Sequence, residues 1–254
     1  MRLAIIADPH CGQPYGVGAF IRGVTGRHDK RNGRRLAQIV DRLNELTEVF
    51  RLAALGDITH RGMPQEYREA QKALMRYKGP VFLVPGNHDT TDAKRMGLGF
   101  SMDGLRGFES LARAVQGESC YPMAIQCEGY RLLLVDSSAH GERGTLFARG
   151  RIGNRQLAWL ASELADPRPT VVAMHHYPEK VNPTLAVEDA EALMTICARD
   201  HVTIINGHRH REGEYPRTQD RPEILTHGQC VESGRVRILD PASGEWEWLE
   251  VGLG

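Results

Sequence analysis

Residues 81–89 read Val81-Phe82-Leu83-Val84-Pro85-Gly86-Asn87-His88-Asp89. An apolar, β-branched run that stops at proline and glycine predicts a buried strand over Val81–Val84. Gly86 carries no side chain, so the backbone beside Asn87 can approach a crowded centre closely. The stretch therefore predicts a strand that ends in an amide, an imidazole and a carboxylate.

Four further clusters of polar side chains follow apolar runs in the same way. The runs and clusters are Leu3–Ala7 with Asp8-Pro9-His10, Leu52–Leu55 with Gly56-Asp57, Val171–Met174 with His175-His176, and Thr203–Ile205 with Asn206-Gly207-His208-Arg209-His210. Alternate residues of extended backbone share a face, so Asp8 and His10 can bind one ion, and His208 and His210 place two imidazoles on one face. Ligands in open α/β sheets bind beyond the carboxyl ends of the strands. One such histidine alone would be read as a hydrogen-bonded loop residue, but five clusters in this position predict a single site.

The apolar runs alternate with stretches of helical period, which is typical of a layered α/β fold. A sixth strand is expected at Leu132–Val135. Three helices are predicted by apolar residues at three- and four-residue steps: Leu36, Ile39, Val40, Leu43 and Leu46; Leu157, Leu160, Ala161 and Leu164; Ala190, Leu193, Met194 and Cys197. We expect residues 1–254 to form one domain, in which residues 211–254 are a loop region and a closing hairpin of Gly234–Ile238 and Glu245–Val251. Long loops are expected from Cys11 to Gly33 and from Thr90 to Gly104.

The composition excludes several classes of protein. The 32 basic residues balance 32 acidic ones, so no overall positive field would recruit nucleic acid or an anionic membrane. Five scattered cysteines without a CxxC pair argue against a disulfide framework and a zinc ribbon. The first apolar run is too short for a signal peptide, and no run is long enough to span a bilayer, so we expect a cytoplasmic protein.

The ordered set of clusters resembles the signature of the calcineurin-like metallophosphoesterase family. The matching positions are Asp8-x-His10, Gly56-Asp57, Gly86-Asn87-His88-Asp89, His175 and Gly207-His208-x-His210. The flanking stretches Gly56–Gly62 with Glu66-Tyr67, and Gln156–Leu160, are similar to the class III cyclic nucleotide phosphodiesterase and glycerophosphodiesterase branch. The resemblance implies an α/β, four-layer αββα sandwich with a metal site at the carboxyl ends of the strands.

The resemblance also implies two divalent metal ions. One would be bound by Asp8, His10, Asp57 and His210, and the other by Asp57, Asn87, His175 and His208. Asp57 would bridge them, since the two oxygens of a carboxylate can span ions about 3.5–4 Å apart. Oxygen and imidazole donors without thiolate suit manganese, iron or zinc, and the family favours manganese or iron. His176 is the alternative to His175, which directly follows its strand.

Other roles follow from the same resemblance. His88 would protonate the leaving oxygen or stabilise the transition state, and Asp89 would orient its ring. His176 and Tyr177 are the expected substrate contacts, although Tyr177-Pro178 stands where the branch usually has two prolines, and a packed loop tyrosine is the alternative. The basic stretch within residues 22–35 is read either as a contact for a substrate phosphate or a neighbouring subunit, or as a solvated face.

The expected activity is hydrolysis of a small phosphodiester, such as a cyclic nucleotide or a glycerophosphodiester, by attack of a metal-bridging hydroxide on phosphorus. A phosphomonoesterase is the alternative within the family. A catalytically silent binding scaffold is disfavoured because every ligand position is filled, and nucleic acid is disfavoured as a partner. The branch often forms dimers, so a homodimer is expected.

Overall fold

The computed structural model describes residues 1–14, 29–48, 50–90, 104–138, 149–178 and 186–254. These residues form two sheets. The first has the order β11-β10-β1-β2-β3, with β11 at Trp246–Glu250, β10 at Arg235–Leu239, β1 at Leu3–Ile6, β2 at Arg51–Leu55 and β3 at Val81–Val84. The second has the order β4-β5-β6-β7-β9-β8, with β4 at Met123–Gln126, β5 at Arg131–Leu134, β6 at Thr170–Ala173, β7 at Val202–Asn206, β9 at Glu223–Thr226 and β8 at Gly213–Tyr215.

Parallel strands form the centre of each sheet. Strands β1, β2 and β3 run parallel, and so do β5, β6, β7 and β9. Each of these strands is buried over most or all of its length, which explains why it reads as a continuous apolar run in the sequence. The carboxyl ends of neighbouring parallel strands therefore lie at a common edge, where the polar clusters begin.

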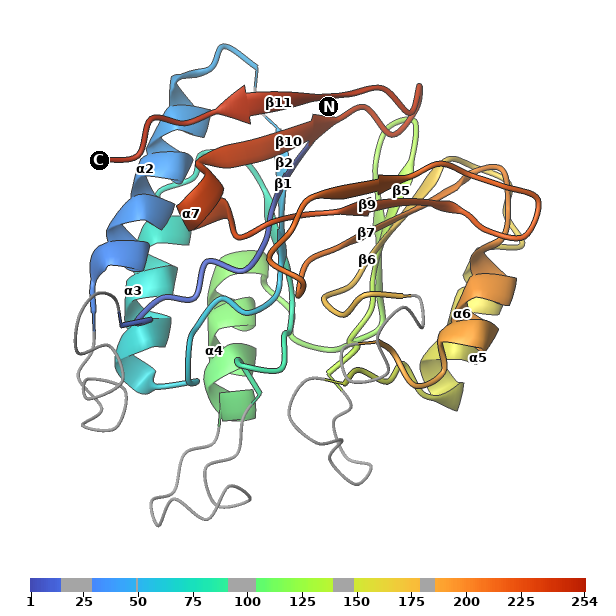
Figure 1. Ribbon diagram of the computed structural model, residues 1–254, viewed down its shortest axis with the longest axis horizontal. Helices are drawn as coiled ribbons and strands as arrows, with labels where there is room; N and C mark the ends of the chain where they lie inside the picture. Colours follow the sequence, from blue (N-terminus) through green and yellow to red (C-terminus); the bar gives the residue numbers. More distant parts are fainter. Residues whose placement is uncertain (15–28, 49, 91–103, 139–148, 179–185) are drawn as a thin grey trace.

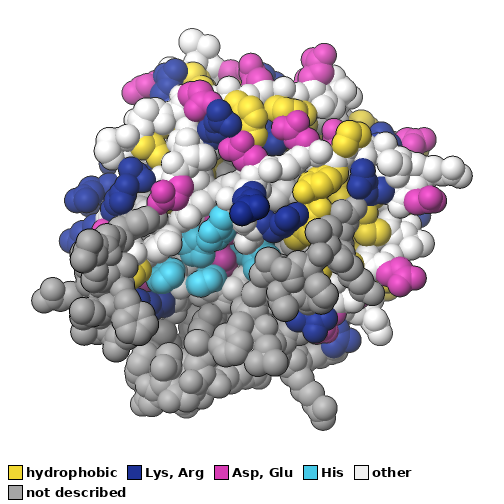
Figure 2. All heavy atoms as spheres, in the orientation of Figure 1, with side chains coloured by type: hydrophobic (Ala, Val, Ile, Leu, Met, Phe, Trp, Pro, Cys, Tyr) yellow, Lys and Arg dark blue, Asp and Glu magenta, His cyan; other side chains and the backbone are white. Residues whose placement is uncertain are grey.

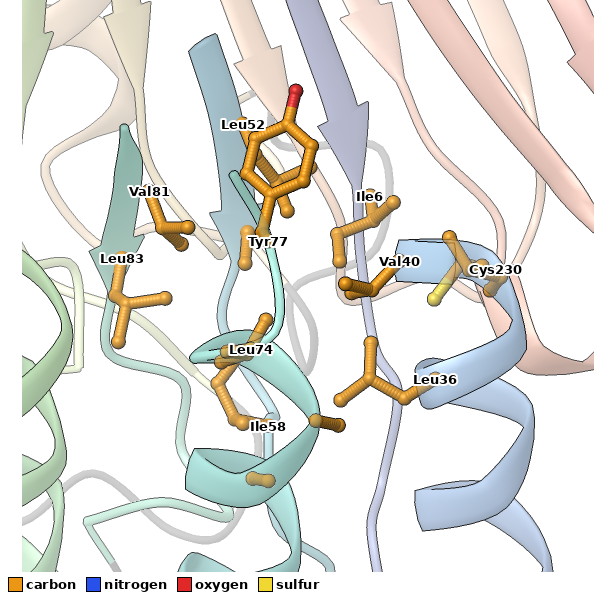
Figure 3. Close-up of a cluster of buried hydrophobic side chains, with 14 of the residues drawn as sticks. Ile6, Leu36, Val40, Leu52, Ile58, Leu74, Tyr77, Val81, Leu83 and Cys230 are labelled. Carbon is orange, nitrogen blue, oxygen red and sulfur yellow. The ribbon is translucent and has the colours of Figure 1, made fainter. Parts of the chain in front are cut away.

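Helices cover the outer face of each sheet (Figure 1). Helices α2 (Arg31–Glu45), α3 (Pro64–Leu74), α4 (Gly104–Gln116) and α7 (Cys230–Ser233) cover the first sheet, and α5 (Asn154–Glu163) and α6 (Ala190–Cys197) cover the second. Figure 3 shows the first of these interfaces, where Leu36 and Val40 of α2 and Leu74 of α3 face Ile6 and Leu52. A third apolar cluster fills the space between the sheets, and the predicted αββα sandwich is confirmed.

The six predicted strands are confirmed, and their ends agree with the structure to within one residue. The three predicted helical stripes lie on α2, α5 and α6, although α2 ends one residue before Leu46 and α5 one residue before Leu164. The sequence did not predict α3 or α4. Residues 211–254 form the expected hairpin, β10 with β11, but β8 and β9 extend the second sheet instead of lying in a loop. These short strands escaped detection because Pro216 and Pro222 interrupt a charged segment.

The predicted basic loop of residues 22–35 is wrong at its carboxyl end. Arg31, Arg34 and Arg35 belong to helix α2, where Arg35 Nη1 donates to the carbonyl of Val231 at 2.9 Å. The first turn of the helix is polar, so the apolar stripe did not reveal where the helix begins. Residues 15–28 and 91–103, which make up most of the two expected long loops, lie outside the described residues.

All five cysteines are free thiols. Among the described helices, none combines the length and the apolar character that crossing a membrane requires.

A buried histidine joins the two sheets behind the polar clusters. His227 follows β9, and its Nε2 accepts a hydrogen bond at 3.2 Å from Nε of Arg237 on β10. The Arg237 guanidinium lies 4.0 Å from the ring centroid of Trp246 and 4.2 Å from that of Trp248. Burial, and then the charge of Arg237, lowers the pKa of His227 to about 3. The folded protein therefore holds this imidazole in its neutral form.

This burial predicts loss of stability in acid. An unfolded histidine has a pKa of about 6.5, so between that value and the folded pKa the unfolded chain binds a proton that the folded chain does not. The contribution of His227 is fully present above the unfolded pKa and is lost as the pH falls toward the folded pKa. At pH 5 we expect the free energy of unfolding to be lower by about 2 kcal/mol from this group alone. Urea unfolding at pH 7 and pH 5 measures the difference, which should shrink in His227→Gln; an equal difference in both proteins would assign the acid sensitivity to other groups.

Candidate metal and catalytic centre

The five polar clusters meet at the carboxyl ends of β1, β2, β3, β6 and β7. Figure 2 shows histidine side chains gathered at one place on the visible face, with Lys or Arg side chains beside them. The first sheet contributes Asp8, His10, Asp57 and Asn87, and the second contributes His175, His208 and His210. The structure thus brings all seven predicted metal ligands to one region, in two groups.

The first group joins residues from opposite ends of the chain. One donor atom from each of Asp8, His10, Asp57 and His210 lies within 4.8 Å of the others. His10 Nε2 is 3.0 Å from His210 Nε2 and 3.6 Å from Asp57 Oδ2. His210 Nε2 is 3.5 Å from Asp8 Oδ1. This is the predicted first ligand set.

The second group surrounds His175. Its Nε2 is 3.3 Å from Asp57 Oδ2, 3.2 Å from Asn87 Oδ1 and 3.2 Å from His208 Nδ1. Its Nδ1 donates to the carbonyl of Leu55 at 2.8 Å, so in neutral His175 the lone pair is on Nε2. That carbonyl is the kind of outer partner that orients a metal-binding imidazole.

The donor chemistry of this group fits a cation. In neutral His175, the Nε2 lone pair faces a carboxylate oxygen and an amide oxygen, and such atoms repel one another unless a positive charge lies among them. Although burial opposes the charged form, the Asp57 carboxylate raises the pKa of His175 to about 9. The side chains thus favour a positive charge at this point, and a divalent ion would meet the same requirement.

Asp57 connects the two groups through one oxygen. Its Oδ1 accepts the backbone N–H of His88 at 2.9 Å, which leaves Oδ2 facing both His10 and His175. Because Oδ1 is held by a backbone N–H, the predicted bridge between the two groups would be made here by Oδ2. A single oxygen lies between the two groups.

Glycines give the backbone its close approach to these ligands. A Cβ on Gly86 would overlap Asp57 Oδ1, a Cβ on Gly56 would lie 2.6 Å from His175 Nδ1, and one on Gly207 would lie 2.5 Å from Asp8 Oδ2. No side chain fits at such separations. Gly86 was predicted to permit this close approach and does so, and Gly56 and Gly207 do the same.

Backbone strain is concentrated in the same residues. Within the described part of the chain, the non-glycine residues with positive φ are Asp8, His10, Asp57, His208 and His210, with φ between +44° and +70°. Such conformations cost on the order of 1–3 kcal/mol each and persist only where the surrounding structure enforces them. The backbone conformations that orient these side chains therefore lower the free energy of unfolding.

His88 lies beside the first group. Its ring is edge-on to that of His10, with centroids 4.8 Å apart, and its Nδ1 donates to the carbonyl of His60 at 2.6 Å. A carbonyl only accepts hydrogen bonds, so Nδ1 carries the proton. The prediction that Asp89 orients this ring is wrong, because the His60 carbonyl does so.

Asp89 instead connects two loops of the centre. Its carboxylate accepts the backbone N–H groups of Ile58, Thr59 and Gly86 and the Thr59 hydroxyl, at 2.9–3.1 Å. Burial, and then the charge of Asp57, raises the pKa of Asp89 to about 6. The four hydrogen bonds oppose that shift and hold the loop after β2 against the loop after β3.

The two predicted substrate contacts are both buried. The His176 side chain is fully buried, and its Nδ1 lies 2.9 Å from the Ser137 hydroxyl. Tyr177 is 2% exposed, and the Arg209 guanidinium lies 4.7 Å from its ring centroid. Tyr177 is thus a packed loop tyrosine, as in the alternative reading, while its contact with substrate stays a prediction.

Sequence reasoning left out two residues of the centre. The His60 ring stacks on that of His88 with centroids 5.5 Å apart, and burial, then the charge of His88, lowers the pKa of His60 to about 4. Its position directly after the Gly56-Asp57 motif was the available signal. Ser137 follows β5. This strand was predicted, but no histidine follows its end, so Ser137 was not considered as a site residue.

Comparisons with known proteins show which family this chain resembles. Residues 1–212 match the sequence profile of the family described as calcineurin-like phosphoesterase. Glycerophosphodiester phosphodiesterase GpdQ of Enterobacter lignolyticus is 31% identical over 83% of this chain and 71% of its own length. A cAMP/cGMP dual specificity phosphodiesterase of Mycobacterium tuberculosis is 29% identical over 80% of this chain and 66% of its own length, slightly less than two-thirds. The structure of a 5'-nucleotidase precursor from Thermus thermophilus shares the fold, with 13% identity, a TM-score of 0.54, and coverage of 99% of this chain and 54% of that one.

Proposed function

Because the chain belongs to the calcineurin-like phosphoesterase family and is a metal-dependent phosphoesterase, we propose that it hydrolyses small phosphodiesters, such as a cyclic nucleotide or a glycerophosphodiester, with two divalent metal ions. One observation carries the dinuclear part of the proposal. Asp57 Oδ2 is 3.6 Å from His10 Nε2 and 3.3 Å from His175 Nε2, so one oxygen serves both donor groups. The printed names of the relatives support the diester.

Asp8, His10, Asp57 and His210 would bind one ion, and Asp57, Asn87, His175 and His208 the other. When bound, two such ions supply activation of water near neutral pH and neutralisation of charge on the phosphoryl oxygens. Nitrogen and oxygen donors without thiolate suit manganese or iron, with zinc as a further candidate.

The protein's own proton donor would be His88. The His60 carbonyl occupies Nδ1, so Nε2 is the atom that faces away from this anchor and can exchange a proton. To protonate a leaving alkoxide, the ring must enter the reaction as imidazolium. Asp89 would affect catalysis indirectly, because it holds the loop after β2 against the loop after β3.

The test compares two substrates on one preparation. Chelator-stripped protein, reconstituted with Mn²⁺, is assayed with bis-p-nitrophenyl phosphate and p-nitrophenyl phosphate. We expect metal-dependent cleavage of the diester at the higher kcat/KM. Cleavage of the monoester alone would replace the proposal with a phosphomonoesterase, and absence of turnover with two bound metals would favour a binding scaffold.

His88→Ala is expected to keep both metals and to lose at least about tenfold in turnover, because a positioned proton donor contributes about 10²–10⁴-fold. Metal content by elemental analysis and kcat on the diester measure the two properties. His140→Ala, at a histidine to which no role is assigned, serves as the comparison. Unchanged turnover in His88→Ala would remove this residue from the mechanism.

We further propose that residues 1–254 act as a single domain, in the cytoplasm and as a homodimer. Both sheets contribute to the central apolar cluster, which supports one domain. Five free cysteines are typical of a reducing compartment. Light scattering during size-exclusion chromatography tests the dimer, and a monomer mass would refute it.

A further inference from the structure

Ser137 makes three contacts with the histidine pair that follows β6. It is fully buried after the end of β5, next to β6 in the second sheet. Its hydroxyl accepts the backbone N–H of His175 at 3.3 Å and that of His176 at 3.1 Å. The same oxygen lies 2.9 Å from His176 Nδ1.

These contacts fix the tautomer of His176. A serine hydroxyl has two acceptor lone pairs and one proton. Both lone pairs are used by backbone N–H groups, so the hydroxyl proton is donated to His176 Nδ1. Nδ1 is then an acceptor, and the ring proton of His176 must be on Nε2.

The proton on Nε2 has no acceptor among the residues that the structure describes. The atom is buried, and the ring around it is fully buried. Burying such a donor without an acceptor costs about 1–3 kcal/mol. A buried, oriented and unpaired N–H is therefore expected to bind a ligand.

The surroundings place this donor beside the second group. The His176 ring centroid is 4.9 Å from that of His175 and 4.6 Å from that of His208. Gly150 closes the ring on another side, since a Cβ there would lie 2.5 Å from His176 Cγ. Ser137 and Gly150 thus hold the ring between them and the two predicted ligands.

We propose that Ser137 is a positioning residue and that His176 Nε2–H is a neutral hydrogen-bond donor to an oxyanion, a phosphoryl oxygen of substrate or product, held at the second metal group. The inference rests on the proposed function and adds, to the substrate contact that the sequence predicted at His176, the donor atom and the residue that positions it. A neutral donor would bind an anion without bringing further positive charge to a site that would already hold two cations.

Inorganic phosphate is the probe, titrated calorimetrically into protein reconstituted with Mn²⁺. We expect Ser137→Ala and His176→Phe each to weaken phosphate binding about tenfold, while both metals are retained. Ser137→Thr keeps the hydroxyl and should bind phosphate nearly as the unmodified protein does. The double variant Ser137→Ala/His176→Phe should be no weaker than His176→Phe alone, because the serine acts only through the histidine.

Ser110→Ala, at an exposed serine on α4, is the matched control and should change nothing. Unchanged phosphate binding in His176→Phe, additive losses in the double variant, or loss of a metal from Ser137→Ala would each overturn the inference. If Ser137→Ala fails to fold, His176→Phe and Ser137→Thr decide the matter. If phosphate binding depends on His176 but the protein cleaves no diester, the proposed function is refuted and the His176 donor is retained. If the protein cleaves the diester but its phosphate binding does not depend on His176, the proposed function is retained and the donor is refuted.

Discussion

Asp57→Asn is expected to lower diester turnover by at least about a thousandfold, which corresponds to about 4 kcal/mol of transition-state stabilisation. The buried Oδ2 faces both donor groups, and its negative charge would separate two cations. An amide at this position is neutral, and its nitrogen is a hydrogen-bond donor that does not bind a cation. The measurement is kcat on bis-p-nitrophenyl phosphate together with the number of metals bound per chain.

The matched control is Asp220→Asn, which removes an exposed carboxylate from the segment between β8 and β9. Its turnover and metal content should equal those of the unmodified protein. If Asp57→Asn keeps two metals and more than a tenth of the turnover, the bridging role assigned to Asp57 is wrong.

Gly86→Ala is expected to be nearly as damaging, although it adds one methyl group and removes no ligand. The new Cβ would overlap Oδ1 and the backbone nitrogen of Asp57, and neither can move without displacing the bridging oxygen. Overpacking of this kind costs about 1–3 kcal/mol of stability. We expect turnover to fall at least about a hundredfold, since small misplacements at a reacting centre have effects of that size.

Gly252→Ala is the comparison, because a Cβ at Gly252 meets nothing within 4 Å. Thermal unfolding, metal content and diester turnover should all be unchanged in that variant. If Gly86→Ala has the turnover of the unmodified protein, the loops after β2 and β3 can separate freely. That result would contradict the role of the Asp89 hydrogen bonds that join the two loops.

The ligand positions could be predicted because they depend on strand ends, and strand ends are visible in the sequence. Two examples are the apolar runs Val81–Val84 and Thr203–Ile205, each of which ends abruptly. Because neighbouring parallel strands end at the same edge of a sheet, the residues that follow them lie together there. Their relation to the glycines was also visible, because Gly86 and Gly207 precede the ligands directly.

The orientation of His88 could not be predicted, because its partner is a backbone carbonyl from another loop. Every residue has such a carbonyl, so the sequence contains no sign that His60 supplies it. The hydrogen bonds of Asp89 have the same origin, and the family pattern suggested the wrong partner for its carboxylate. Strands β8 and β9 were missed for a different reason: they are short, and Pro216 and Pro222 interrupt the charged segment that contains them.

The composition of the two donor groups has a consequence for how the protein matures. His10 and His210 are 200 positions apart and come from different sheets, yet their Nε2 atoms lie 3.0 Å apart. Bringing such distant segments together is a late and slow event in folding, because the entropy of closing a long loop must first be overcome. A nascent chain that extends only through β1, β2 and β3 would offer a metal ion no complete set of donors. Metal binding would therefore indicate that the two sheets have packed together. The bound ions would then cross-link the two sheets, and a chelator would remove this cross-link.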